Sequence, residues 1–327
     1  MQTRQLGSSP VRASVITFGA WAIGGAMWGG TDERKAIDAI RASIDLGITS
    51  IDTAPVYGFG KSEELVGRAV AGRRDEVQIF TKFGLRGDIA EGEFFFHLNE
   101  DGGADVYRNA RKERIIEECE RSLKCLNTDR IDLYQCHWRD HTTPVEETME
   151  ALAELHKAGK ILAGGVSNFT AEEIDACRKV FPVASLQPPY SMVFRGIEAD
   201  ILPYCRENNV GVIVYSPMQR GLLTGKFSPE HKFAEGDSRA GDRFFQPENI
   251  RRVNRMLDEM RPLAAEHKAT LGQVVINWTI RQPGVTAALV GARDAAQARE
   301  NAGALAFTLS DADLSAIDSL IDNLVLE

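Results

Sequence analysis

The chain has 327 residues, of which 43% are hydrophobic, and a formal net charge of −9. This length suits one large α/β barrel as well as two average domains, and the apolar content is enough for a sizeable core. The acidic balance argues against nucleic acid or an anionic membrane surface as the main partner.

A strand-like run followed by a helix-like run recurs eight times along the chain. The strand-like runs are almost continuously apolar, as in strands covered on both faces, and the helical runs repeat apolar residues at i, i+3, i+4 and i+7. The predicted strands span 14–21, 48–52, 77–84, 130–138, 160–169, 183–190, 210–218 and 285–292. The predicted helices span 32–47, 62–72, 111–127, 144–159, 171–180, 198–209, 249–269 and 295–305.

Three segments lie outside this repeat. Residues 3–14 are expected to form a short hairpin that plugs the barrel floor, and residues 270–284 an additional helix before the last strand. Residues 310–322 are expected to form a C-terminal helix with Ser310 as its N-cap. The sequence therefore predicts an α/β fold, a (β/α)8 TIM barrel in a single domain over residues 1–327, with an N-terminal β-hairpin and additional C-terminal helices.

The cysteines and the first residues bear on the compartment. Five cysteines, none of them in a C-x-x-C pair, argue against structural zinc and against a disulfide framework, and free thiols suit a reducing compartment. The start, MQTRQLGSSP, has no apolar stretch like that of a secretory signal, and no apolar run approaches the ~20 residues that span a bilayer. We expect a cytoplasmic protein with neither a metal nor a membrane segment.

Four polar residues stand at or near the carboxyl ends of successive strands, where barrel enzymes carry their active sites. They are Asp52 and Tyr57 in SIDTAPVYG, Lys82 in IFTKFG and His137 in YQCHW. A lysine inside an apolar strand needs a partner for its charge, and Asp52 is the nearest candidate. The cation is expected to lower the pKa of Tyr57 toward neutrality, where a proton donor works best. Each residue alone is equally compatible with a structural ion pair; the four together favour a functional site.

These motifs, D-T-A-x-x-Y-G, then T-K-F-G, then a strand-end histidine, resemble the aldo-keto reductase tetrad, and the similarity extends over nearly the whole chain. The resemblance implies that Tyr57 is the general acid and base, that Lys82 and Asp52 tune it, and that His137 positions the carbonyl group. It also implies a nicotinamide cofactor.

The same resemblance implies a set of cofactor contacts. Ser167, Asn168 and Gln187 would hold the carboxamide and Tyr215 would stack on the nicotinamide ring. At the first strands, it implies contacts from Gly19, Ala20, Trp21 and Asp52. At the adenine side, it implies Gln297, Glu300 and Asn301.

Phosphate groups in barrels bind near the loops after the last two strands. Residues 216–227 supply glycine-rich backbone and polar side chains there, and residues 291–301 open a helix whose N-terminus favours anions. The candidates are Ser216, Pro217, Gly221, Leu222, Thr224, Lys226, Gly291 and Arg293, with Arg239 and Arg243 in a loop (228–248) that could fold over the pyrophosphate. A solvated helix face is the alternative for Arg293.

The sequence departs from many NADP-preferring relatives, which have a Lys-Ser pair where this chain has Gly291-Ala292. Gln297 stands where those relatives have a downstream arginine. The G-A-R pattern that Arg293 completes resembles bacterial members of the family that commonly use NADP, which favours NADP(H) and leaves NAD(H) possible. The chain has no G-x-G-x-x-G between a strand and a helix, so a dinucleotide would have to bind in the barrel manner.

The substrate pocket is expected to involve Trp21, Trp28, Tyr57, His137 and Trp138, which suggests apolar or sugar-stacking contacts, although the tryptophans could simply seal the barrel rim. An extended loop (85–110) containing EFFFH is expected to shape specificity or to act as a lid. The substrate, a small-molecule carbonyl, alcohol or sugar, and the oligomeric state stay open.

Three functions compete. The first is reversible hydride transfer between a nicotinamide cofactor and an aldehyde, ketone or alcohol. The second is a non-catalytic subunit that senses nicotinamide nucleotides, against which the complete tetrad argues. The third is a lyase or aldolase that uses Lys82 as a Schiff base, against which the neighbouring Asp52 argues.

Overall fold

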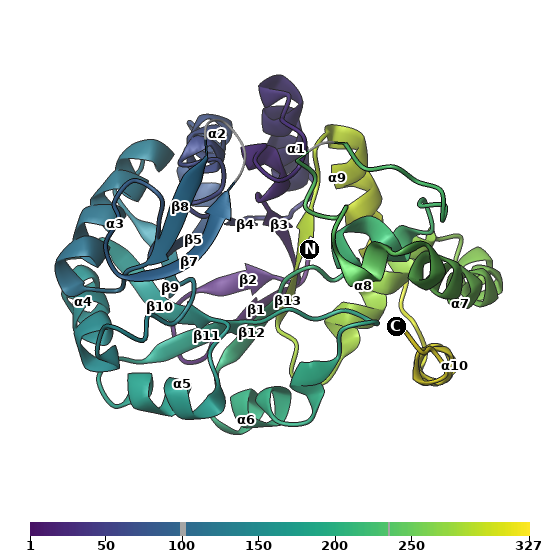
Figure 1. Cartoon of the computed structure of the whole chain (residues 1–327). Helices are drawn as coiled ribbons and strands as arrows, with labels where there is room; N and C mark the ends of the chain where they lie inside the picture. The colour runs from purple at the N-terminus through teal and green to yellow at the C-terminus, as the bar shows by residue number, and fades with distance from the viewer. Residues whose placement is uncertain (99–102, 235) are drawn as a thin grey trace.

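The computed structural model describes residues 1–98, 103–234 and 236–327. Its centre is a closed barrel of eight parallel strands (Figure 1), which confirms the predicted (β/α)8 fold. In barrel order the strands are β10 (Ile161–Ser167), β11 (Val183–Gln187), β12 (Gly211–Val214), β13 (Ala287–Gly291), β3 (Ile16–Gly19), β4 (Ser50–Asp52), β5 (Gln78–Phe83) and β9 (Ile131–Cys136).

Amphipathic helices surround the barrel and cover the outward faces of its strands (Figure 1). They are α1 (Glu33–Asp45), α2 (Lys61–Val70), α3 (Lys112–Leu126), α4 (Val145–Lys157), α5 (Ala171–Arg178), α6 (Ile201–Glu207), α8 (Leu271–Arg281) and α9 (Ala295–Ala302). Several begin at caps that the sequence encodes, such as Thr170 and Thr270, which each form a capping box with the residue three positions later.

One helix assignment from the sequence was wrong. The helix α7 (Pro247–Glu266) lies outside the ring, whereas α8 occupies the barrel position before the last strand (Figure 1). The difference is one of burial: nine residues of α8, from Leu271 to Ile280, are buried, while α7 buries a single stripe. Both segments have helical periodicity, so periodicity alone does not tell which one faces the strands.

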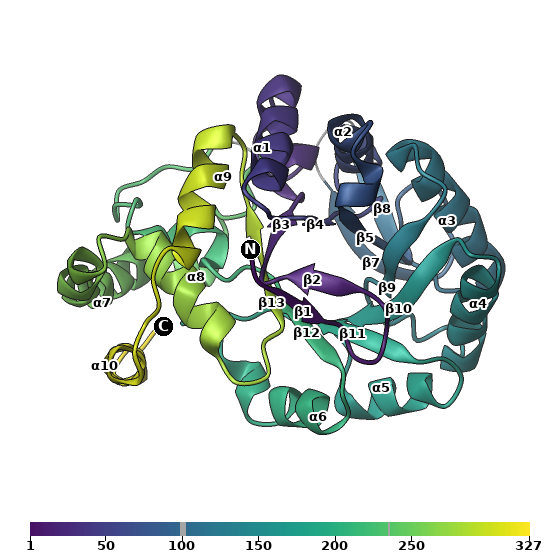
Figure 2. The same ribbon diagram turned by 180° about the vertical axis from the view of Figure 1, so that it is seen from behind.

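The two ends of the chain add small elements, as predicted. Strands β1 (Thr3–Gln5) and β2 (Arg12–Ser14) form an antiparallel hairpin across one end of the barrel (Figure 2). Leu6, Val11 and Ala13 from this segment pack into the barrel interior against Phe80 and Leu133. At the other terminus, α10 (Asp311–Asp322) begins at a capping box in which Ser310 is the N-cap.

Residues 85–110 are more ordered than the loop that the sequence analysis expected. Strands β6 (Leu85–Arg86), β7 (Glu93–Leu98) and β8 (Ala104–Arg108) form a small antiparallel sheet in the order β6-β8-β7. Residues 99–102 of the predicted loop lie outside the described residues. This small sheet stands beside the barrel strands β5 and β9 (Figure 1), close to where they end.

Helix α7 is the longest helix of the described residues, but neither it nor any other described helix combines the length and apolar character needed to cross a membrane. All five cysteine thiols are free. No three His, Cys, Asp or Glu side chains gather as metal ligands would in the described part of the chain.

Two carboxyl groups are buried between the barrel and its helices. Glu63 of α2 accepts a hydrogen bond from the Thr81 hydroxyl at 2.7 Å, and Glu118 of α3 accepts one from the Gly84 amide at 2.9 Å. Burial raises the pKa of Glu63 to about 7 and that of Glu118 to about 8. Both groups therefore hold protons in the folded chain at pH values where the unfolded chain has lost them.

This proton uptake predicts that stability falls as pH rises. Between the unfolded pKa of ~4.5 and the folded values near 7 and 8, each group removes roughly 1.4 kcal/mol of unfolding free energy per pH unit. Glu118→Gln keeps an oxygen for the Gly84 amide and cannot ionise, so its stability relative to wild type is expected to improve from pH 6 to pH 8.5. Urea unfolding at both pH values measures this; equal differences at the two pH values would contradict it.

Candidate active site

The predicted ion pair lies inside the barrel mouth. Lys82 shares the inward face of β5 with Phe80, its side chain is 0% exposed, and its Nζ lies 2.5 Å from Asp52 Oδ1. The same Nζ donates a hydrogen bond to the Thr53 carbonyl oxygen at 2.9 Å. Two partners therefore satisfy the buried ammonium, which an apolar strand could not hold alone.

Amides from neighbouring strands hold the second carboxylate oxygen. Gln187, at the end of β11, donates to Asp52 Oδ2 at 2.8 Å, and Gln135 of β9 approaches the same atom at 3.5 Å. Gln135 in turn accepts a hydrogen bond from the Ser185 hydroxyl at 3.2 Å. This polar layer fixes the carboxylate, and with it Lys82, in one orientation.

Tyr57 lies directly above this pair, and Lys82 Nζ is 5.0 Å from the centre of its ring. The expected lowering of the Tyr57 pKa is wrong. Burial raises the pKa of the phenol well above its ordinary value, and the negative charge of Asp52 adds to the rise. Because Asp52 already neutralises Lys82, the phenol experiences an ion pair and not a free cation, and it keeps its proton.

His137 completes the group. It follows β9, and its ring packs edge-on against Tyr57 with centroids 5.7 Å apart. Burial, with a smaller effect from Lys82, lowers the pKa of His137 well below its ordinary value. The imidazole is therefore neutral at physiological pH and can donate one hydrogen bond to an oxygen beside the phenol.

The turn that carries Tyr57 is packed tightly against the short 3-10 helix Ala22–Gly24. Gly58 has φ +64°, and a Cβ on it would lie 2.2 Å from the Gly24 carbonyl oxygen. A Cβ on Gly24 would lie 2.8 Å from the backbone of Tyr57. Glycine at both positions lets the two backbones touch, which sets the height of the phenol in the mouth.

We expect Gly58→Ala to destabilise the chain more than Gly72→Ala. Gly72 also has a positive φ, +78°, but nothing lies within 4 Å of its added Cβ. The control should lose about 1 kcal/mol from left-handed backbone alone. Gly58→Ala should lose roughly 2 kcal/mol more from the overlap, and some activity because Tyr57 shifts. Unfolding free energies from urea titrations test this, and equal losses would refute the packing argument.

A second connected set of polar groups lies at the ends of strands β9 to β12. Asn168, at φ +62° after β10, donates to the His137 carbonyl oxygen at 3.2 Å and accepts from the Tyr215 hydroxyl at 2.9 Å. The Ser167 hydroxyl donates to the Gln187 carbonyl oxygen at 2.7 Å. These contacts link strand ends β9 to β12 and hold the Tyr215 ring at the cavity.

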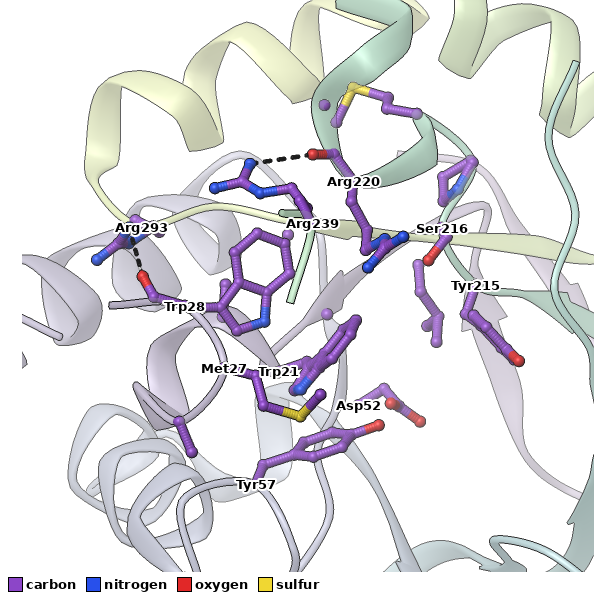
Figure 3. Close-up of a pocket in the computed structure, with 18 of the residues that line it drawn as sticks. Trp21, Met27, Trp28, Asp52, Tyr57, Tyr215, Ser216, Arg220, Arg239 and Arg293 are labelled. Carbon is purple, nitrogen blue, oxygen red and sulfur yellow. Dashed lines mark hydrogen bonds between the residues drawn. The ribbon is translucent and has the colours of Figure 1, made fainter. Parts of the chain in front are cut away.

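One cavity of about 690 Å³ joins these groups (Figure 3). All five predicted substrate residues line it: Trp21, Trp28, Tyr57, His137 and Trp138. Most predicted cofactor residues line it as well: Gly19, Trp21, Asp52, Ser167, Asn168, Gln187, Tyr215, Ser216, Pro217, Gly221, Thr224, Lys226, Gly291, Arg293, Gln297, Glu300 and Asn301.

Three predicted cofactor residues are not among the lining residues. Ala20 is fully buried and uses its amide on the Asp52 carbonyl oxygen. Leu222 is fully buried in the hydrophobic core. Arg243 lies in the 3-10 helix Arg243–Phe245 with its guanidinium 4.8 Å from the Phe244 ring. The side chains of these three residues are therefore not part of the cavity wall.

Several lining residues after the last strands were not predicted from the sequence, among them Met218, Arg220 and Gln273. Gln273 was overlooked because its helix, α8, was assigned outside the barrel ring. Arg220 has φ +52° within the tight segment Gln219–Thr224, and this backbone turns its side chain into the cavity (Figure 3). The adjacent Gly221 is the only sequence signal for such a turn.

Cations gather at this end of the cavity. Arg220 pairs with Asp242, and Arg239 pairs with Asp237 at 2.6 Å while donating to the Arg220 carbonyl oxygen. Arg293 donates to the carbonyl oxygens of Trp28 and Gly30 (Figure 3). Lys226 is exposed and lies 3.5 Å from Glu300. The donor set and the length of the cavity fit an elongated molecule with phosphates at one end and a planar group near Tyr215.

Comparison with known proteins agrees with this geometry. The profile of the Aldo/keto reductase family matches residues 15–322. The chain is 41% identical to aldo-keto reductase YhdN of Bacillus subtilis, over 99% of this chain and 95% of the relative. It is 37% identical to the NADH-specific methylglyoxal reductase of Escherichia coli, over 99% of both.

Solved structures give the same result. The glycerol dehydrogenase AKR11B4 from Gluconobacter oxydans is 38% identical to the chain and superimposes with a TM-score of 0.88, over 99% of this chain and 96% of that protein. Residues 15–322, with the barrel and the cavity described above, lie within these matches. The chain belongs to the aldo-keto reductase family of oxidoreductases.

Proposed function

We propose that this chain catalyses reversible hydride transfer between a nicotinamide cofactor and an aldehyde or ketone, with Tyr57 as general acid and base. The observation that carries the proposal is the buried Lys82–Asp52 pair beneath the Tyr57 ring in the cavity. The third function considered from the sequence, a Schiff base on Lys82, conflicts with this arrangement because the amine is buried and ion-paired.

Each group has a defined task in the proposed reaction. The cofactor, when bound, supplies or accepts the hydride. Tyr57 donates its phenolic proton to the carbonyl oxygen during reduction and takes a proton from the alcohol during oxidation. His137, neutral, donates a hydrogen bond to the same oxygen and orients it. The Lys82–Asp52 pair keeps a fixed cation and its counter-charge below the Tyr57 phenol. It also prevents water from taking the place of either of these two side chains.

Asn168, Ser167 and Gln187 would hold the carboxamide of the nicotinamide, and Tyr215 would stack on its ring. Arg220, Lys226, Arg239 and Arg293 would bind the phosphates. We favour NADP(H) because Arg293 stands at the N-terminus of α9, where a 2′-phosphate would find both charge and amides. The relatives differ: one is named NADH-specific and one from Schizosaccharomyces pombe carries NADP(+) in its name. A small-molecule substrate and a cytoplasmic location complete the proposal.

The direct test is fluorescence titration with NADPH and with NADH, followed by steady-state assays on a panel of aldehydes and ketones with the tighter cofactor. We expect tighter binding of NADPH and turnover of at least one carbonyl. Binding without any turnover in either direction would instead support the nucleotide-sensing alternative.

The pKa shifts predict the pH dependence of both directions. Because His137 stays neutral and Tyr57 stays protonated through neutral pH, carbonyl reduction should show no inflection near the ordinary histidine pKa of ~6.5. Alcohol oxidation needs the deprotonated phenol, so its kcat/KM should keep rising to at least about pH 9. Profiles of kcat/KM in each direction check this; a fall in reduction between pH 6 and 7 would contradict it.

A further inference from the structure

The part of the cavity wall that residues 85–138 contribute differs in charge from the part contributed by segments after β12 and β13. The exposed or paired cations and Glu300 all come from segments after β12 and β13. The lining that residues 85–138 contribute consists of the neutral His137 and six apolar residues, which we call the aromatic wall: Leu85, Phe95, Phe96, Leu98, Val106 and Trp138. Within the described part of the chain, this part of the cavity offers a substrate no charged side chain beyond the buried ion pair.

A β-bulge builds the aromatic wall. In the pairing of β7 with β8, Phe94 is opposite Tyr107 and Phe96 is opposite Val106, so Phe95 is an extra residue. In a regular strand, Phe95 and Phe96 would point to opposite faces, but here both line the cavity. Phe94 points outward and is 56% exposed. The register shift therefore brings two consecutive aromatic rings to the site.

Arg108 holds the aromatic wall together from behind. Its guanidinium lies 4.0 Å from the centre of the Phe95 ring and 5.6 Å from that of Trp138, and it pairs with Glu93 at 3.2 Å. The two rings are themselves 5.2 Å apart. Trp138 directly follows His137, so the wall begins one residue from the proposed oxygen-binding group.

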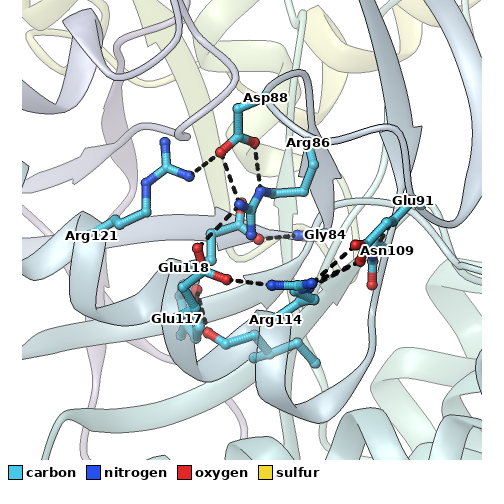
Figure 4. Close-up of polar contacts among 11 residues, drawn as sticks. Gly84, Arg86, Asp88, Glu91, Asn109, Arg114, Glu117, Glu118 and Arg121 are labelled. Carbon is cyan, nitrogen blue, oxygen red and sulfur yellow. Dashed lines mark hydrogen bonds and ion pairs between the residues drawn. The ribbon is translucent and has the colours of Figure 1, made fainter.

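The small sheet is also fixed to helix α3 by a network of ion pairs (Figure 4). The buried Arg86 binds Asp88 through two nitrogens, at 2.8 and 2.9 Å, and Asp88 also binds Arg121 of α3 at 2.5 Å. Glu91 binds Arg114 of the same helix at 2.9 Å. These contacts anchor β6 and the segment that precedes β7 to α3, so this part of the wall is held in place before a substrate binds.

We propose that the site prefers uncharged carbonyl compounds bearing an aromatic ring, which packs on the aromatic wall, with Arg108 as a positioning residue. The proposal rests on the proposed oxidoreductase function and makes its substrate class specific. A flat apolar ring would displace water from Phe95, Phe96 and Trp138 while its aldehyde reaches Tyr57. A small hydrated dicarbonyl would leave water on the wall, and an anionic aldehyde would find no cationic side chain among the six lining residues of the wall.

The test compares kcat/KM for benzaldehyde and for methylglyoxal with the better nicotinamide cofactor. We expect wild type to favour benzaldehyde by at least about tenfold. Phe95→Ala should reduce this ratio at least about tenfold, mainly through KM, and Phe94→Ala, on the outer face of the same strand, should leave it within about twofold. Phe95→Leu should restore part of the ratio because it retains apolar bulk.

Arg108→Lys tests the positioning role. The lysine retains the charge for Glu93 but loses the flat guanidinium that stacks on both rings, so KM for benzaldehyde should rise about three- to tenfold with little change in kcat. Circular dichroism and thermal unfolding confirm that each variant folds. An equal change in KM for benzaldehyde and methylglyoxal would mean that Arg108 does not act through the aromatic ring of the substrate, and would overturn its assigned role.

Two further outcomes overturn the proposal: methylglyoxal used as well as benzaldehyde by wild type, or the same ratio in Phe95→Ala and Phe94→Ala. If no carbonyl compound is reduced at all, the oxidoreductase proposal fails. The aromatic wall can then still be tested by measuring ligand binding. Titration with benzyl alcohol, followed by tryptophan fluorescence in the presence of oxidised cofactor, should then give a weaker Kd for Phe95→Ala than for wild type. Equal Kd values would overturn the aromatic wall as well.

Discussion

Tyr57→Phe is expected to reduce kcat for carbonyl reduction by about 10²- to 10⁴-fold, the range for loss of a general acid. The substitution removes only the hydroxyl. The ring remains to pack against Trp21 and His137, whose centroids lie 6.3 and 5.7 Å away. The raised pKa of the phenol means that the removed group carried its proton at neutral pH. The loss should therefore fall on the chemical step and leave ground-state binding unchanged.

Cofactor titration provides the control. The predicted phosphate and carboxamide contacts come from residues after β10 to β13 and do not involve the Tyr57 hydroxyl, so Kd for NADPH should change less than about twofold. Single-turnover reduction separates hydride transfer from product release. Retention of more than about a tenth of kcat, in a variant that binds cofactor normally, would show that another group delivers the proton.

The grouping of the four tetrad residues could be predicted because, in a barrel, a residue's place along its strand determines where it lies in space. Residues that end parallel strands share one mouth, so Asp52, Lys82 and His137 meet although up to 85 residues separate them in sequence. The (β/α)8 order, the floor hairpin and the Ser310 cap followed from periodicity and capping residues in the same way. These properties depend on local pattern and on the topology that the pattern implies.

Other features depend on how deeply a residue is buried and on where its side chain points, and a sequence pattern contains neither. The sign of the Tyr57 pKa shift was wrong because desolvation, which requires the folded surroundings, outweighs a cation that Asp52 already neutralises. The roles of α7 and α8 were assigned the wrong way round, because two adjacent amphipathic segments both fit the helix position before the last barrel strand. Arg220 enters the cavity through a left-handed backbone that its own residue type does not predict. The bulge at Phe95 likewise became visible only from the strand pairing.

The buried ion pair carries the largest expected effect on stability. Asp52→Asn leaves the Lys82 ammonium at 0% exposure without a counter-charge, and Lys82→Met leaves the Asp52 carboxylate at 2% exposure with only amide donors. Each is expected to lose about 3–5 kcal/mol of unfolding free energy. The double variant Asp52→Asn/Lys82→Met removes both charges and should lose clearly less than the sum, by at least about 1 kcal/mol. Urea unfolding of the four proteins measures this coupling.

The pH dependence of Asp52→Asn separates a charge effect from a packing effect. Burial lowers the pKa of Lys82, and the loss of Asp52 lowers it further because the carboxylate opposed that shift. A lysine with a depressed folded pKa binds fewer protons when folded than when unfolded. The stability of this variant relative to Asp52→Asn/Lys82→Met should therefore fall as pH decreases from 9 to 6, since Glu63 and Glu118 titrate alike in both proteins. The Asp52→Asn/Lys82→Met variant lacks the titrating amine and should not show this additional slope. If both variants lose stability equally over that range, the destabilisation comes from altered packing of the polar layer, and the ion pair is not what holds Lys82 in the barrel.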